Sequence, residues 1–249
     1  MSLVPAVTEM LFAIGAGPQV VAVSSYDTYP PEVASLPRVG ALLDPDLERI
    51  LSLRPDLVVI YGSQRDLEQQ LERSGVPVFR LVHGGLADIT TTMTALGGRI
   101  GRVEEARHAV GRVLTQIAQV RARVADRPRP RTLLVFGRAP GSLRNLYASG
   151  GYGFLHDMLT AAGGENVFAD VPRESVQASA EMILARRPEV ILEFHAEAAP
   201  PDLDAWGTLP SVPAVAARRV IALSGSDLVI PGPRVGDAIE RIAEALHPR

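Results

Sequence analysis

The 249-residue sequence contains no cysteine. This absence excludes disulfide bonds, cysteine metal centres and cysteine nucleophiles, but it suits oxidising and reducing compartments alike. An excess of one charge is missing too, because 25 Lys and Arg residues stand against 28 Asp and Glu residues, a formal net charge of −3. A chain so balanced has no electrostatic footprint for nucleic acid or for an anionic membrane surface.

Long hydrophobic runs and known catalytic motifs are also missing. No apolar run approaches the roughly 18 residues that a membrane-spanning helix needs, although hydrophobic residues make up 47% of the chain and can form a real core. The sequence has no Gly-x-Ser-x-Gly elbow, no phosphate-binding loop and no His-Glu-x-x-His pair. We therefore expect no catalytic residue, no resident cofactor and no metal site.

Short β-branched runs alternate with helical stretches along most of the chain. Such alternation is typical of an α/β fold with mainly parallel sheets flanked by helices. The predicted strands are Val20–Ser24, Leu57–Tyr61, Val78–Leu81, Thr132–Phe136, Val190–Glu193 and Val220–Ala222. The predicted helices are Thr8–Ile14, Asp46–Leu53, Asp66–Ser74, Gly153–Ala162, Ser179–Ala185 and Val235–Leu246.

One segment breaks this alternation. Val103–Ala125 carries apolar residues at helical spacing and ends at an Arg-Pro-Arg-Pro sequence, which predicts a rod of roughly 35 Å at about 1.5 Å per residue. A single long helix between two α/β lobes accounts for this pattern, with lobes at 1–88 and 128–249 and a linker at 89–127. The alternative is one larger α/β domain with one long crossover.

The two halves contain a similar block. Residues 45–59 and 178–192 both read as Glu, any residue, Ile-Leu, a basic-Pro-acidic corner and an apolar strand. The glutamates of the two blocks are Glu48 and Glu181, each in the first turn of a short helix, where a carboxylate suits the positive end of the helix dipole. The proline ends the helix and directs the chain into the strand.

Several segments, taken in their order and spacing, resemble one family nearly end to end. They are Ser2–Glu9, Val23–Pro31, Leu47–Val59, Gly163–Phe168, the block around Glu181, and Pro233-Arg234. The sequence resembles the cobalamin, haem and siderophore class of periplasmic substrate-binding proteins of ABC importers, and its cobalamin-binding members above all. The resemblance implies two α/β lobes joined by one long backbone helix, the class III arrangement, with the ligand in the cleft between them.

The resemblance also implies a partner and a location. In this class one surface glutamate on each lobe docks to arginines of the membrane permease, and Glu48 and Glu181 hold the matching positions. We expect a monomer that binds no nucleic acid. We also expect it to be periplasmic or lipid-anchored outside the cytoplasm, with a signal peptide that is absent from this sequence.

Aromatic residues make up only 5% of the chain, yet several of them follow predicted strands, where the ligands of α/β proteins bind. Together with polar neighbours they form the candidate ligand-binding set: Tyr26, Tyr29, Tyr61, Gly62, Arg138, Tyr147, Trp206, Asp227 and Arg234. A large flat ligand can stack on the aromatic rings while Arg and Asp contact its polar rim. The resemblance makes a corrinoid the first candidate.

Other ligands and two other functions remain open. A haem carrier needs an axial ligand, for which the candidates are Tyr26, Tyr61, Tyr147 and His195. A ferric siderophore calls for two or three arginines, for which the candidates are Arg138, Arg144 and Arg234. Of the two other functions, one is an enzyme built on the same scaffold, and the other is a stand-alone sensor or scavenger with the same fold.

Overall fold

The computed structural model describes residues 1–82, 84–195 and 202–248. By its internal contacts the chain forms two compact units. Unit 1 comprises Met1–His83 and Asp88–Arg112, and unit 2 comprises Gly84–Ala87 and Val113–Arg249. The division falls inside the long helix α5 (Val103–Val124), which confirms the single long helix expected from the sequence. The predicted lobe limits of 1–88 and 128–249 stay a prediction.

Unit 1 is built around a small parallel sheet. Strand β1 (Val58–Tyr61) pairs with β2 (Val78–Leu81), with Val58 opposite Val78. The strand predicted at Val20–Ser24 is wrong as a full strand, because this stretch forms only isolated bridges, from Val23 to Ser2 and to Arg38. The helices are α1 (Pro5–Ala13), α2 (Leu47–Ser52), α3 (Arg65–Arg73), α4 (Leu86–Arg99), which begins in unit 2, and 3-10 turns at Gly17–Gln19 and Pro31–Ser35.

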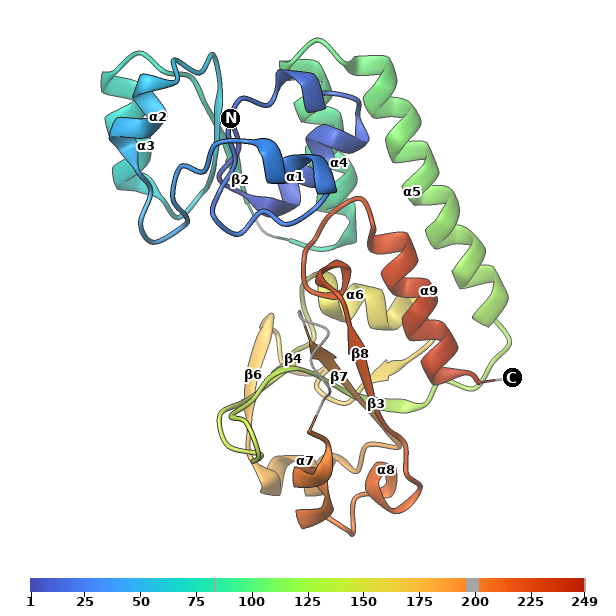
Figure 1. Ribbon diagram of the computed structural model, residues 1–249. Coiled ribbons are helices and arrows are strands. Elements are labelled where there is room, and N and C mark those ends of the chain that lie inside the picture. The colour runs from blue at the N-terminus through green and yellow to red at the C-terminus, as the bar shows by residue number, and fades with distance from the viewer. Residues whose placement is uncertain (83, 196–201, 249) are drawn as a thin grey trace. The chain divides into compact units, whose positions relative to one another are not determined.

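Unit 2 has a six-stranded mixed sheet in the order β6-β4-β3-β7-β8, with β5 beside β3 (Figure 1). The predicted parallel strands are confirmed as β3 (Arg131–Gly137), β7 (Val190–His195) and β8 (Val220–Ser224). Three further strands were not predicted: β4 (Leu146–Ser149), β5 (Glu165–Asn166) and β6 (Ser175–Ala178). Of these, β4 and β6 run antiparallel to their neighbours. These strands are two to four residues long, too short to give a clear pattern.

Helices cover this sheet, and one of them is tied to α5. They are α6 (Phe154–Ala161), α7 (Ala180–Arg186), α8 (Pro213–Ala216) and α9 (Val235–Leu246), with 3-10 turns at Asp204–Thr208 and Ser226–Leu228. The Arg123 guanidinium pairs with the Glu240 carboxylate on α9 at 2.9 Å. The carboxyl-terminal half of α5 is therefore part of unit 2.

The similarity of the two blocks extends to their backbones. Asp46 caps α2 by accepting a hydrogen bond from the Arg49 amide, and Ser179 caps α7 in the same way. Each helix is followed by an arginine in the left-handed region, Arg54 with φ 48° and Arg187 with φ 51°. Because bulky residues rarely adopt this conformation, the shared turn is strong support for equivalent corners.

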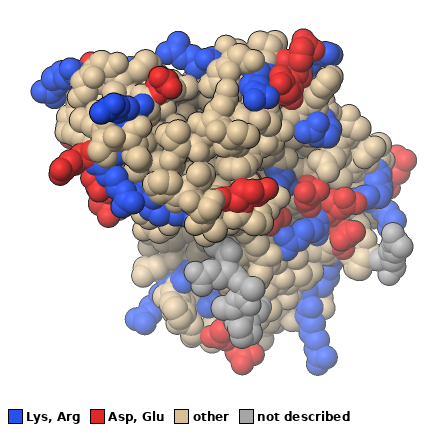
Figure 2. Space-filling view, turned by 45° about the horizontal axis from the view of Figure 1, so that its top comes forward, with Lys and Arg blue, Asp and Glu red and all other residues tan. Residues whose placement is uncertain are grey.

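Charged side chains of both signs are distributed over the surface, as the balanced composition predicts. Basic and acidic side chains are interspersed on the face shown in Figure 2, with uncharged surface between them. Within the described ranges no helix is both long enough and apolar enough to cross a membrane.

Candidate functional site

The loop after Val23 in unit 1 displays two tyrosines on a backbone held by hydrogen bonds. The Ser24 amide and hydroxyl both donate to Asp27 Oδ2, at 2.8 and 2.5 Å. From the other side, Arg38 Nη1 donates to the carbonyl oxygens of Ser24 and Asp27, at 2.9 and 2.7 Å. Tyr26, 72% exposed, and Tyr29, 41% exposed, therefore project from a well-supported loop.

The Asp27 carboxyl group is buried beneath this loop, with a residue exposure of 2%. Burial raises its pKa above the ordinary 3.8, and hydrogen bonds from Ser24 and Thr8 together with the Arg38 charge offset part of that rise. In the folded protein the Asp27 carboxyl group therefore keeps its proton at pH values where the same group in the unfolded chain has lost it.

Asp27→Asn tests this linkage. Because the folded pKa is the higher one, the contribution of Asp27 to stability is full below pH 3.8 and is lost as the pH rises through the raised pKa. Urea denaturation at a series of pH values measures the free energy of unfolding. We expect the Asp27 contribution to it at low pH in the parent protein and not in the variant. Glu72→Gln, which changes an exposed carboxyl group of unit 1, should keep the parent profile; identical profiles for Asp27→Asn and the parent would contradict the assignment.

Tyr61 and Gly62 lie where β1 ends. The Tyr61 amide donates to Gln64 Oε1 at 3.0 Å, and Gln64 Nε2 donates to the Leu42 carbonyl oxygen at 3.0 Å. Gln64 therefore joins the end of β1 to the turn at 40–45. Burial, and secondarily the charge of Asp27, raise the pKa of the half-buried Tyr61 hydroxyl.

Three apolar side chains missed by the sequence analysis lie at the same edge. Leu43 is 93% exposed at the tip of the 40–45 turn, Leu42 precedes it, and Val82 is exposed just after β2. The turn requires Gly40, whose φ is 82° and where a Cβ would lie 2.2 Å from the Asp44 carbonyl oxygen. The Ser25 amide donates to the Gly40 carbonyl oxygen at 2.8 Å, which links this turn to the tyrosine loop.

We call this set the unit 1 edge: Tyr26, Tyr29, Leu42, Leu43, Tyr61 and Val82. It lies at the carboxyl ends of parallel strands, the usual ligand-binding position of α/β folds. The signal that could have revealed its aliphatic part is the Leu42-Leu43 pair between a glycine and a proline, a place where apolar residues have no core to enter.

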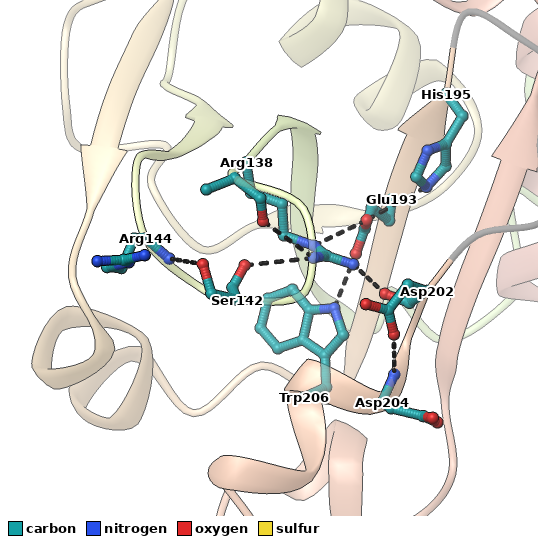
Figure 3. A network of polar contacts seen from close by, with 9 residues as sticks. Arg138, Ser142, Arg144, Glu193, His195, Asp202, Asp204 and Trp206 are labelled. Atoms are coloured by element: carbon teal, nitrogen blue, oxygen red, sulfur yellow. Dashed lines mark hydrogen bonds and ion pairs between the residues drawn. The ribbon is translucent and has the colours of Figure 1, made fainter.

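In unit 2 the predicted residues Trp206 and Arg138 face inward (Figure 3). Trp206 is 1% exposed within the hydrophobic core, and its indole N–H donates to Glu193 Oε2 at 2.8 Å. Arg138 Nε donates to Glu193 Oε1 at 2.9 Å, and only 6% of the Arg138 side chain is exposed. The burial of Trp206 contradicts the expectation that its ring lines a ligand site.

Other contacts complete this buried network. Arg138 also donates to the carbonyl oxygens of Ser142, at 3.2 Å, and Asp202. His195 Nε2 lies 3.2 Å from Glu193 Oε1 but lacks hydrogen-bond geometry. One carboxylate thus takes up the charge of Arg138 and the indole N–H, the partners that a buried arginine and a buried tryptophan require.

The network predicts a large stability effect. Glu193→Gln removes the charge that pairs with Arg138, and we expect a loss of about 3–5 kcal/mol in the free energy of unfolding, since a buried charge is left unpaired. Trp206→Phe keeps most of the ring and should cost less, about 1–3 kcal/mol. Urea denaturation followed by circular dichroism measures both; a Glu193→Gln loss below that of Trp206→Phe would contradict this ranking.

Asp227 and Arg234 hold the turn after β8. Arg241, which the sequence analysis missed, donates to Asp227 Oδ2 at 2.8 Å and to the Ser224 carbonyl oxygen at 2.6 Å. Arg234 donates to the Ser226 hydroxyl at 2.9 Å and lies 3.9 Å from Asp227 Oδ1. These polar groups are already engaged with one another, and their role toward a ligand stays a prediction.

Tyr147 is the predicted aromatic residue of unit 2 that is open to solvent. It lies on β4 with 41% exposure, and its ring centroid is 6.4 Å from that of Phe136. Its role as a ligand contact stays a prediction.

The two glutamates of the matched blocks occupy equivalent exposed positions. Glu48 lies in the first turn of α2 and Glu181 in the first turn of α7. A hydrogen bond with Ser179, followed by a backbone hydrogen bond, lowers the pKa of Glu181. Both carboxylates are therefore presented to solvent at the ends of short helices. Within the described residues no group of three or more His, Asp or Glu side chains is placed to hold a metal ion.

Comparison with known proteins assigns the family. The family model described as periplasmic binding protein matches residues 1–226. The chain belongs to the periplasmic binding protein family. It is 33% identical over 249 residues to the vitamin B12-binding protein of Salmonella typhimurium, which covers 99% of this chain and 89% of the relative.

Solved structures of other periplasmic binding proteins share the fold. The periplasmic vitamin B12 binding protein BtuF of Vibrio cholerae is 28% identical, with a TM-score of 0.82 over 98% of this chain and 94% of that one. The periplasmic heme-binding protein RhuT of Roseiflexus sp. RS-1 is 27% identical, also with a TM-score of 0.82, over 98% of this chain and 96% of that one. The predicted fold class is thereby confirmed, and the relatives include binders of both vitamin B12 and haem.

Proposed function

We propose that this chain is the substrate-binding protein of an ABC importer and that its ligand is a corrinoid. The observation that carries the proposal is the unit 1 edge, an exposed aromatic and aliphatic surface at the carboxyl ends of parallel strands. Such a surface suits the broad, largely apolar faces of a macrocycle. The whole-length similarity to a vitamin B12-binding protein supports the same ligand.

Haem is the second candidate, supported by the similarity to a heme-binding protein. A tyrosine ligand to haem iron acts as the phenolate. Burial and the Asp27 charge raise the pKa of the Tyr61 hydroxyl and so oppose phenolate formation there. This argues against Tyr61 as the axial ligand and leaves Tyr26, Tyr147 and His195 as the candidates. The similarity over nearly the whole chain to a vitamin B12-binding protein is our reason for placing the corrinoid ahead of haem.

An anionic ferric siderophore fits the arginines poorly. Arg138 is paired with the buried carboxylate of Glu193, and Arg234 is engaged with Ser226 and Asp227. Of the three candidate arginines, Arg144 is the one whose side chain is exposed. A single exposed guanidinium gives weak neutralisation of a multiply charged complex.

Calorimetric titration with cyanocobalamin, hemin and a ferric siderophore tests the ligand. We expect cyanocobalamin to bind one to one and Tyr26→Ala to weaken that binding about tenfold, since loss of one stacking ring removes about 1.4 kcal/mol. Tyr152→Ala is the matched control, because Tyr152 is also well exposed but belongs to unit 2 and lies outside the candidate set. Equal weakening by both variants, or tight binding of hemin in place of cyanocobalamin, would contradict the proposal.

The docking role of the two glutamates is a separate claim with its own test. We expect Glu48→Lys combined with Glu181→Lys to reduce uptake by a reconstituted importer at least about tenfold, because two attractive charge contacts become repulsive. The control pair Glu72→Lys and Glu244→Lys reverses one exposed glutamate in each unit and should leave uptake unchanged. Ligand affinity in solution should be unaffected in all variants, and a full transport rate for the first pair would refute docking through Glu48 and Glu181.

A further inference from the structure

The 40–46 turn of unit 1 lies between two surfaces for which a function has been proposed. It carries Leu42 and Leu43 of the unit 1 edge, and it leads directly into α2, whose first turn holds Glu48. A link between these surfaces rests on the proposed function, because the ligand would use the first surface and the permease the second. The hydrogen bonds around the turn provide the structure of such a link.

The base of the turn and the start of α2 are held together as one piece. The Asp46 amide donates to the Val39 carbonyl oxygen at 3.1 Å, and Gly40 pairs with Pro45 in an antiparallel bridge. Asp46 Oδ1 also accepts a hydrogen bond from the Arg49 amide at 2.9 Å. One residue therefore closes the turn with its amide and caps α2 with its carboxylate.

The buried side chain of Gln64, which is 9% exposed, joins this piece to the end of β1. Its Oε1 accepts from the Tyr61 amide and its Nε2 donates to the Leu42 carbonyl oxygen, each at 3.0 Å. Its own carbonyl oxygen accepts from the Glu68 amide at 3.0 Å and so fixes it at the start of α3. Because a buried amide that loses a partner is costly, Gln64 resists separation from either neighbour.

The turn is joined to the tyrosine loop as well. The Ser25 amide, directly before Tyr26, donates to the Gly40 carbonyl oxygen at 2.8 Å. This bond acts at the base of the turn, whereas Gln64 holds its arm at Leu42. A displacement of the arm is therefore passed to the end of β1 through the Gln64 side chain.

We propose that Gln64 is a positioning residue that couples α2 to the unit 1 edge. A permease cation that attracts Glu48 moves α2 and the turn together. Because Gln64 bonds to both Leu42 and Tyr61, the displaced turn carries the aliphatic tip and the end of β1 away from their ligand-bound positions. Docking at α2 then lowers ligand affinity, and by thermodynamic linkage a bound ligand weakens docking at α2 by the same factor.

The equivalent helix of unit 2 is anchored differently. Helix α7 follows directly on β6, and Ala178 at the end of β6 pairs with Leu146 of β4. Its capping residue Ser179 thus continues a strand inside a sheet, whereas Asp46 continues a projecting turn. Docking through Glu181 should therefore leave ligand affinity unchanged, so the two docking glutamates have unequal roles.

Amide hydrogen exchange in the ligand-free protein tests the coupling. Asp46→Ala removes the cap, and we expect exchange of the Gly62 amide, which donates to the Leu81 carbonyl oxygen at 2.8 Å, to become at least about tenfold faster. Gln64→Met is similar in length and makes neither hydrogen bond. In that background Asp46→Ala should change Gly62 exchange by less than about twofold, because the connection is already cut. Ser179→Ala uncaps α7 and is the matched control, which should leave Gly62 unchanged.

Cyanocobalamin titration with and without the nucleotide-free importer measures the coupling to docking. We expect docking to weaken the affinity about tenfold in the parent protein and less than about twofold in Gln64→Met. Gln69→Met changes an exposed glutamine of α3 and should keep the parent ratio.

Non-additive exchange together with loss of the docking effect in Gln64→Met supports the coupling. Unchanged Gly62 exchange in Asp46→Ala, or equal acceleration in both backgrounds, would overturn it. A docking ratio that is the same in the parent and in Gln64→Met would overturn it too. If the parent protein does not bind cyanocobalamin, the corrinoid proposal fails, and the ligand-free exchange alone decides the coupling.

Discussion

The pairing of Asp27 and Arg38 with the backbone at 24–27 is the constraint on which the unit 1 edge depends. Without those bonds Tyr26 would sit on a loop free to fold onto the surface, because exposed aromatic residues gain by burying their rings. Asp27 holds the loop from below through Ser24, and Arg38 holds it through two carbonyl oxygens. A preorganised loop lowers the entropy lost on binding a rigid ligand.

Unit 2 uses its charged and aromatic residues in a different way. Glu193 sits on the buried strand β7 and draws Arg138 and Trp206 inward. Asp227 pairs with Arg241, whose side chain stays partly exposed beside β8. These groups set the shape of the loops at the strand ends. Tyr147 is the exposed aromatic residue that this unit adds to the candidate ligand-binding set. The contrast favours apolar recognition by unit 1.

Helices and strands that follow from local sequence patterns could be predicted. The burial of side chains whose contacts come from distant parts of the chain could not. The long helix and the parallel strands β1, β2, β3, β7 and β8 follow from apolar periodicity, and their predicted ends lie within two residues of the observed ones. The position of Trp206 could not be predicted, because strand-end location does not reveal that a buried carboxylate thirteen residues earlier accepts its N–H. The exposed Leu42-Leu43 turn was missed for the converse reason, since leucine usually indicates a core.

A crystal structure of the protein with cyanocobalamin tests the central claim most directly. We expect the corrin ring to contact Tyr26 and Tyr61 together with the aliphatic tip at Leu42-Leu43. We also expect Trp206 to stay buried against Glu193, out of contact with the ligand. A corrin that stacks on Trp206, or a ligand bound away from the unit 1 edge, would contradict the central claim.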